Sequence, residues 1–204
     1  LYGMPYKHKE ISEIASRYDI PVIEDAAEAL GSSYNGIPCG TLGQVSVLSF
    51  NGNKIITTSG GGALVCSTAQ QKADVIFLAT QAKDDAPHYE HSTIGYNYRL
   101  SNVSAGIGRG QMEVLEQRVG QKQELNRLYR DFFSGIDGVE VFTDYKDSVK
   151  SNHWLTCVVL DQNKTPGKTA EGLRLWLEKD NIESRPLWKP MHLQPVFKQS
   201  IYYG

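Results

Sequence analysis

The chain has 204 residues, of which 40% are hydrophobic, and its formal net charge is -2. This apolar content is enough for one ordinary core or for parts of two. The scattered charges exclude a basic stripe of the kind that binds nucleic acid or a membrane surface, and no apolar run is long enough to cross a bilayer. The cysteines are odd in number and far apart, which favours reduced thiols over a disulfide framework: Cys39, Cys66 and Cys157.

Helix-forming segments and short apolar runs alternate along the first part of the chain. This alternation predicts an α/β fold with a mostly parallel sheet. The polar and aromatic segment 84–98 is irregular and typical of a binding loop. In chain order, the pattern predicts a helix over 8–18, strands over 20–23 and 45–48, a hairpin of 55–58 with 63–66, and a helix over 69–78.

The second part of the chain begins with an extended helical pattern over 101–133, as one long helix or two in sequence. It continues with predicted strands and a helix typical of a smaller α+β unit: strands over 139–142, 154–160 and 182–187, and a helix over 169–179. The long helix would join two domains. We therefore expect a large domain over 1–120 and a small domain over 121–204.

Two acids end the first predicted strand, in the run Val22-Ile23-Glu24-Asp25. Ligands of α/β proteins bind where parallel strands end. A half-buried carboxylate needs a cation or a hydrogen-bond donor, and a pyridinium nitrogen is one such partner for Asp25. A helix N-cap or a structural salt bridge explains the same acid equally well.

A lysine follows the second predicted strand, in Ser49-Phe50-Asn51-Gly52-Asn53-Lys54. Small polar neighbours favour a lysine that points into a cleft. A buried lysine loses its proton more easily than a solvated one, as covalent bonding to a carbonyl group requires. Ser49 and the adjacent backbone N–H groups are a candidate phosphate site. The alternative is a solvated loop lysine, and no phosphate-binding GxxxxGK[ST] loop is present.

Three further motifs carry weaker signals. The alternate glycines of 106–110 lie within helical periodicity, so they indicate close helix packing rather than dinucleotide binding. His88 and His91 have no further ligands in the sequence, so no metal site is predicted. The dense polar and aromatic run 185–192 is explained either by domain packing or by a loop that faces a substrate.

The order and spacing of five segments are more specific than any one of them: EDAAEALGS (24–32), SFNGNK (49–54), the glycines of 60–62, GYNYRLSN (95–102) and RPLWKPMH (185–192). Over essentially its whole length, the chain resembles the DegT/StrS family of sugar aminotransferases that depend on pyridoxal 5'-phosphate (PLP). The resemblance implies PLP fold type I, with part of the large domain and an incomplete small domain. The sequence is most similar to enzymes that aminate a UDP-linked 4-keto-6-deoxy-N-acetylhexosamine, as in the bacillosamine pathway. Relative to the family's usual length, the chain is expected to be an internal to C-terminal part.

The resemblance assigns roles to five cofactor-binding residues. Lys54 matches the lysine that binds PLP covalently, Asp25 the acid that pairs with the pyridinium nitrogen, and Ser49 a serine that binds the phosphate. Glu28 stands where much of the family has a glutamine beside the phenolic oxygen, so it would have to share or donate a proton. Asn97 matches an asparagine that reaches the cofactor of the neighbouring subunit, which implies a homodimer with shared sites.

Arg185, Trp188 and His192 match the loop expected near the sugar. The implied reaction moves an amino group from L-glutamate through PLP to a UDP-linked 4-keto-6-deoxy sugar in the cytoplasm, with Lys54 as the acid and base and Asp25 as its catalytic partner. A PLP-dependent sugar dehydratase is the first alternative, although that class carries histidine in place of the lysine. A non-catalytic homologue that binds nucleotide sugars is the second. An oxidoreductase lacks its glycine fingerprint here.

Overall fold

The computed structural model describes residues 1–203 and divides into two compact units. Unit 1 comprises residues 1–132 and 141–157, and unit 2 comprises residues 133–140 together with the chain from residue 158 onward. The boundary expected near residue 120 falls inside a continuous helix. A division of the family fold into large and small domains at that residue stays a prediction.

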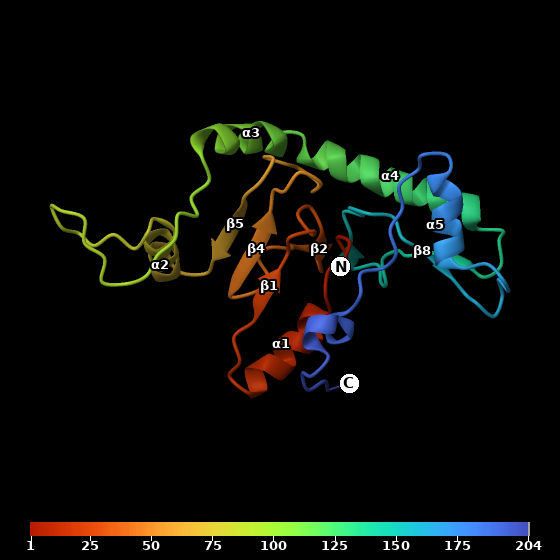
Figure 1. The fold of residues 1–204 in the computed structure, drawn as a ribbon, viewed down its shortest axis with the longest axis horizontal. Coiled ribbons are helices and arrows are strands. Elements are labelled where there is room, and N and C mark those ends of the chain that lie inside the picture. The colour runs from red at the N-terminus through yellow and green to blue at the C-terminus, as the bar shows by residue number, and fades with distance from the viewer. Residues whose placement is uncertain (204) are drawn as a thin grey trace. The chain divides into compact units, whose positions relative to one another are not determined.

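Unit 1 contains a three-stranded sheet in the order β1-β4-β5. Strands β1 (Ile23–Asp25) and β4 (Val45–Ser49) run parallel, and β5 (Gly62–Cys66) runs antiparallel to β4 (Figure 1). Because β1 and β4 are parallel, their C-terminal ends lie at the same edge of the sheet. This arrangement places Asp25 and Ser49 at one edge.

The structure corrects the first predicted strand. It begins at Ile23, rather than covering 20–23, and Ile23 is 72% exposed rather than buried. Proline 21 has no N–H to donate to a ladder, so it does not extend the strand toward the N-terminus. Within residues 1–203, β1 is also an edge strand, because it pairs with β4 on one side and with no strand on the other.

The predicted hairpin of 55–58 with 63–66 is wrong. Strand β5 pairs with β4 in the register Val47↔Leu64, and residues 55–58 form no strand. Ile56 is 1% exposed because it packs against the helix residues Leu115 and Val119. Burial against a helix therefore explains the apolar run that resembled a strand.

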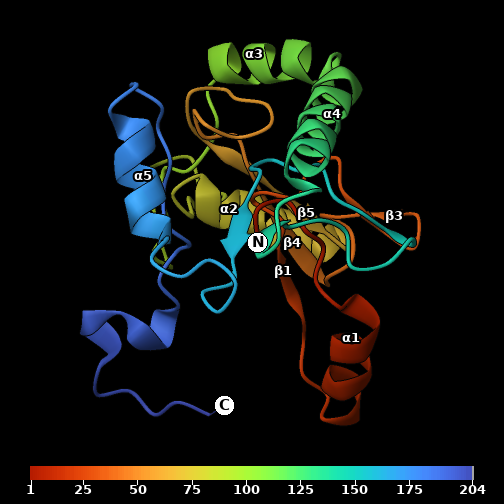
Figure 2. The same cartoon turned by 90° about the vertical axis from the view of Figure 1, so that its right-hand side faces the viewer.

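Four helices surround this sheet: α1 (His8–Arg17), α2 (Ala69–Ala79), α3 (Asn102–Met112) and α4 (Leu115–Phe133). In both views, α1 and α3 lie at opposite ends of the sheet (Figures 1 and 2). A capping box at Thr68 begins α2, and the Ser101 side chain caps α3. The long helical pattern is thus confirmed as two helices in sequence. Within residues 1–203, no helix is both long and apolar enough to cross a membrane.

A second small sheet in unit 1 was not predicted. Strands β2 (Ser33–Tyr34), β3 (Ile37–Pro38) and β7 (Val149–Lys150) pair in the order β3-β2-β7. The side chains of Tyr34 and Val149 meet in a small core with Met4. This sheet therefore brings the residues that follow β7 against the first third of the chain.

Strands β6 (Val139–Val141) and β8 (Val158–Leu160) form a short two-stranded sheet. The helix α5 (Ala170–Glu178) lies in unit 2. Two 3-10 turns follow, η1 (Met191–Leu193) and η2 (Pro195–Phe197). The predicted helix over 169–179 is confirmed with its capping residues. The strand predicted over 154–160 covers only 158–160, and the strand predicted over 182–187 is absent, because proline 186 interrupts that run.

Candidate active site

Lys54 lies in the loop that follows β4. The Lys54 N–H donates to the Asn51 carbonyl (3.1 Å), and the Thr58 N–H donates to the Phe50 carbonyl (2.9 Å), which closes the loop. The lysine side chain is 13% exposed. A solvated loop lysine is therefore not what the structure shows.

The Lys54 ammonium has two partners from distant parts of the chain. Its Nζ lies 3.7 Å from Glu28 Oε1 and 4.4 Å from the centroid of the Trp154 ring. The second oxygen of Glu28, Oε2, accepts a hydrogen bond from the Tyr2 N–H at 2.7 Å. A largely buried ammonium is thus matched by one carboxylate and one aromatic face.

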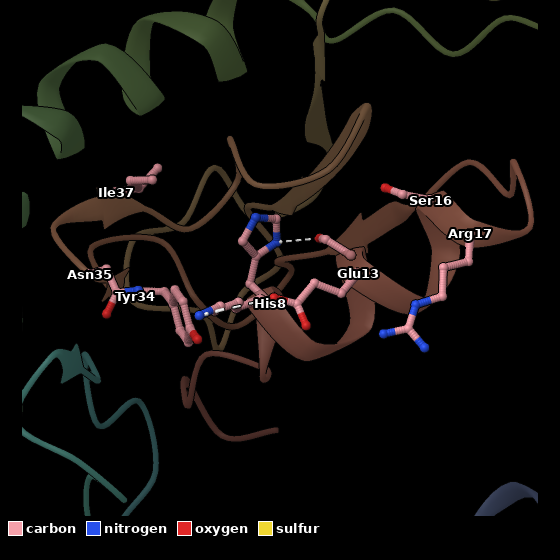
Figure 3. Close-up of a pocket in the computed structure, with 9 residues that line it drawn as sticks. His8, Glu13, Ser16, Arg17, Tyr34, Asn35 and Ile37 are labelled. Carbon is pink, nitrogen blue, oxygen red and sulfur yellow. Dashed lines mark hydrogen bonds and ion pairs between the residues drawn. The ribbon is translucent and has the colours of Figure 1, made fainter.

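Two pockets of unit 1 differ in the residues that line them, and Lys54 does not line the larger of the two. The larger pocket, about 600 Å³, is lined by residues of α1 and of the β2–β3 hairpin, among them His8, Glu13 and Tyr34 (Figure 3). The smaller pocket, about 270 Å³, is lined by Lys54 and Trp154 together with residues of α4. We place the candidate site at the smaller pocket because Lys54, an amine suited to covalent chemistry and largely buried, lines it.

The two acids at the end of β1 point to different surroundings, as alternation along a strand requires. Glu24 is 3% exposed and accepts hydrogen bonds from four donors: the N–H groups of Gly40, Leu42 and Gly43 and the Ser46 hydroxyl. Asp25 is exposed, and its Oδ1 accepts only from the Ala27 N–H (3.0 Å). Within residues 1–203, Asp25 Oδ2 has no hydrogen bond or ion pair. Glu24 is therefore structural, and Asp25 is open to a cation.

The predicted cofactor residues are only partly brought together. Ser49 shares the sheet edge with Asp25, and its Oγ accepts from the Asn51 N–H at 3.4 Å. Asn97 is exposed and pairs with Thr80 in an isolated β-bridge. Within residues 1–203, the Asn97 side chain makes no hydrogen bond, so the chain itself does not place it in the Lys54 group.

The three predicted sugar-binding residues lie in unit 2. Arg185 forms an ion pair with Glu183 (2.7 Å), and the His192 ring stacks on Tyr202 with centroids 4.0 Å apart. Trp188 is 51% exposed. These contacts are local to unit 2, and a role for the three residues in sugar binding stays a prediction.

Sequence reasoning missed the segment 151–154, which it treated partly as strand. Asn152 is fully buried, and its Nδ2 donates to the carbonyls of Glu28 and Leu30, each at 2.8 Å. Trp154 is 3% exposed, and its Nε1 donates to the Asn53 carbonyl at 2.6 Å. One signal was present: a compact polar and aromatic run, Ser-Asn-His-Trp, directly before an apolar strand.

Burial shifts the pKa of several side chains in unit 1. It raises the pKa of the Cys39 thiol to about 12, and the nearby Glu24 carboxylate adds to the shift. The pKa of Tyr6 is raised to about 12 by the same two causes in the same order. Burial lowers the pKa of His153, although Asp144 opposes this. Within residues 1–203, no three His, Cys, Asp or Glu side chains gather as a metal site would require.

Residues 1–204 match the model of the DegT/DnrJ/EryC1/StrS aminotransferase family. The chain belongs to this family. It is 46% identical over 204 residues to the putative pyridoxal phosphate-dependent aminotransferase EpsN of Bacillus subtilis, covering 100% of this chain and 51% of that protein. It is 34% identical over 199 residues to a GDP-perosamine synthase of Escherichia coli O157:H7, covering 98% of this chain and 53% of that protein.

Two further comparisons concern a relative named for a UDP-linked sugar and a solved structure of similar fold. A UDP-4-amino-4,6-dideoxy-N-acetyl-beta-L-altrosamine transaminase of Campylobacter jejuni is 34% identical over 154 residues, covering 72% of this chain and 40% of that protein. The crystal structure of the aminotransferase TlmJ from Streptoalloteichus hindustanus superposes with a TM-score of 0.87 at 25% identity, covering 96% of this chain and 52% of that chain. The expected family and aminotransferase fold are thus confirmed, and the chain spans about half the length of the relatives it matches.

Proposed function

We propose that this chain forms part of a PLP-dependent aminotransferase that moves an amino group from L-glutamate to a nucleotide-linked 4-keto-6-deoxy sugar. The observation that carries the proposal is a largely buried lysine, Lys54, beside Glu28 and close in the chain to a sheet edge that also holds Asp25 and Ser49. The family membership supports the same reaction class.

The residues of this chain fit the chemical groups of PLP. Lys54 offers an amine in a pocket, Asp25 an open carboxylate oxygen for a cationic ring nitrogen, and Ser49 a hydroxyl whose proton is free to donate to a phosphate oxygen. Ala26 and Ala27 follow Asp25 and have no side-chain bulk to obstruct a flat ring. Amine, carboxylate and hydroxyl match the aldehyde, the ring nitrogen and the phosphate of PLP, in that order.

When bound, PLP supplies an electron sink for breaking a bond at the amino-bearing carbon. The chain's own residues do the rest. Lys54 Nζ would take a proton from the amino-bearing carbon of the substrate as a general base and deliver it to the cofactor carbon as a general acid. The Asp25 carboxylate balances the positive charge of the ring nitrogen, and Glu28 lies within reach to hold the Lys54 amine when that amine is not bonded.

The finer parts of the proposal are the nucleotide, the assembly and the compartment. Relatives named for GDP-linked and for UDP-linked sugars both match, and the motifs NGNKIITTSGGG and GYNYRLSN favour UDP. Asn97 is exposed and makes no side-chain hydrogen bond within residues 1–203, as expected of a residue that completes a second copy's site in a homodimer. We place the protein in the cytoplasm, where nucleotide sugars are made.

Absorbance spectroscopy with PLP and L-glutamate tests the proposed function. We expect a visible band on adding PLP to the chain, a shift of that band on adding L-glutamate, and neither change in Lys54→Ala. Reversal of the shift by a UDP-linked but not a GDP-linked 4-keto sugar would support the UDP assignment. A stable band that L-glutamate does not alter would favour a non-catalytic binding protein instead.

A further inference from the structure

The loop that carries Lys54 is attached to Trp154, a residue 100 positions further along the chain. The indole makes two contacts with this loop. Its Nε1 donates to the Asn53 carbonyl at 2.6 Å, and the centroid of its ring lies 4.4 Å from Lys54 Nζ. The first contact holds the backbone next to the lysine, and the second restrains the lysine's charged end. Trp154 is 3% exposed, so neither contact is a surface encounter.

The residue two positions earlier, Asn152, holds the other partner of Lys54. Its Nδ2 donates to the carbonyl of Glu28, and its Oδ1 accepts the Trp154 N–H, both at 2.8 Å. The Asn152 side chain therefore links the turn that contains Glu28 to the backbone of Trp154. Burial makes both bonds costly to break, since an unpaired polar group has no water to replace its partner.

The segment between these two residues is itself fixed. His153 adopts a left-handed backbone conformation (φ 46°), and its N–H donates to Ser151 Oγ at 3.0 Å. The Asn152 N–H donates to Ser32 Oγ at 2.9 Å, and that hydroxyl donates to the Gly3 carbonyl at 2.6 Å. The indole and the amide thus project from a rigid turn rather than from a flexible loop.

We propose that Trp154 is a positioning residue for Lys54, and that the segment 151–154 joins the Lys54 loop to the Glu28 turn. The proposal rests on the proposed function, because the lysine needs a defined position only if it is the reacting amine. Trp154 acts through Lys54 and touches neither substrate nor cofactor in this account. Its ring stabilises the ammonium against the pocket wall, and the Asn53 contact limits how far the loop moves.

Chemical labelling of lysines in the chain, without any cofactor, tests this proposal. Acetic anhydride is the probe, and mass spectrometry gives the extent of acetylation at each lysine. We expect Lys54 to be acetylated about fivefold faster in Trp154→Leu than in the wild type, because the ring contact that restrains the amine is lost. Lys72, which lies on α2, serves as the internal reference and should not change.

Two further variants separate positioning from general loosening of the fold. Trp154→Phe keeps an aromatic face but loses the Nε1 donor, so an intermediate rate is expected if both contacts position the lysine. Ala15→Gly loosens unit 1 at the buried face of α1, a helix that does not line the Lys54 pocket, and should leave the Lys54 rate unchanged. An unchanged Lys54 rate in Trp154→Leu, or an equal rise in Ala15→Gly, would overturn the proposal.

A parallel reaction with PLP and borohydride distinguishes failure of the positioning role of Trp154 from failure of the proposed function. If the wild type gains no pyridoxyl group on Lys54, the proposed function fails, whatever acetylation shows. If the wild type and Trp154→Leu gain it at the same rate, the positioning role fails while the proposed function stands. We expect slower capture at Lys54 in Trp154→Leu and partial rescue in Trp154→Phe.

Discussion

Two regions of unit 1 are predicted to bind PLP, one around Lys54 and one around Asn97. Contacts within the chain fix the arrangement of side chains in the first region only. Lys54 and Glu28 meet in a largely buried pair, supported by contacts from residues more than a hundred positions apart. Asn97 lies near the end of the largely exposed segment 84–98 and pairs with Thr80 in an isolated β-bridge. Buried contacts within the chain define the first region, whereas the second is largely exposed in residues 1–203.

Different physical effects therefore govern the two regions. Around Lys54, buried hydrogen bonds and ionic contacts define a single arrangement, because leaving any member unpaired costs free energy. Around Asn97, exposed side chains lose little when they move. Changes in the first region should therefore alter stability and reactivity, and changes in the second should matter only when a second copy or a ligand is bound.

The largest expected effect is at Asn152. Asn152→Ala removes the donors to two partly buried carbonyls and the acceptor of the buried Trp154 N–H, so we expect the free energy of unfolding to fall by about 3 kcal/mol. Asn97→Ala is the matched control and should change it by less than about 0.5 kcal/mol. Urea denaturation of both variants measures the difference, and equal losses would contradict the comparison.

A smaller loss is expected at Glu24, the buried acid beside Asp25. Glu24→Gln replaces one acceptor oxygen with an amide group, so some of the four donors around it lose their acceptor. We expect the free energy of unfolding to fall by about 2 kcal/mol. Glu13→Gln, at an exposed ion pair with Lys9, should cost less than about 0.5 kcal/mol in the same denaturation experiment.

Alkaline pH should weaken the same region through Cys39. The pKa of its thiol is about 12 in the folded chain and near 9 when unfolded, so the unfolded state releases the proton first as the pH rises. Stability from this group is full below pH of about 9 and declines between about 9 and 12, by at most about 1.4 kcal/mol per pH unit. Cys39→Ser should show a shallower decline, and an identical pH profile would contradict this assignment.

The smallest expected effect concerns the glycines of α3. A Cβ added at Gly108 would lie 2.9 Å from Thr58 Cγ2, whereas one at Gly106 would meet nothing within 4 Å. Gly106→Ala should therefore raise the free energy of unfolding by up to about 1 kcal/mol, through helix propensity alone. Gly108→Ala should gain less, because Thr58 has to shift. Thermal denaturation of the pair would contradict this packing if both variants gained equally.

Much of the secondary structure followed from local patterns. The segments of α1, α2 and α5 carry helical periodicity or capping residues, and β4 and β5 are short apolar runs. The errors arose where tertiary contacts decide the outcome. Ile56 resembles a strand residue but packs under α4, and β2 pairs with β7 across more than a hundred residues, which no local pattern encodes.

The candidate site divides in the same way. Motif order predicted cofactor roles for Lys54 and Asp25, because spacing along the chain can be read from a sequence, and both roles stay predictions. It gave no account of Asn152 and Trp154, whose contacts exist only once β7 has paired with β2. The local strand pattern alone does not distinguish the structural role of Glu24 from the open carboxylate of Asp25, since both follow the same apolar run.

The most direct test of the central claim is covalent trapping at Lys54. The purified chain is incubated with PLP, reduced with borohydride, digested and mapped by mass spectrometry. We predict a reduced pyridoxyl group on Lys54 in excess of that on the exposed lysines, and none at this position in Lys54→Arg. Labelling spread evenly over the surface lysines, with none concentrated on Lys54, would contradict the assignment of this residue as the reacting amine.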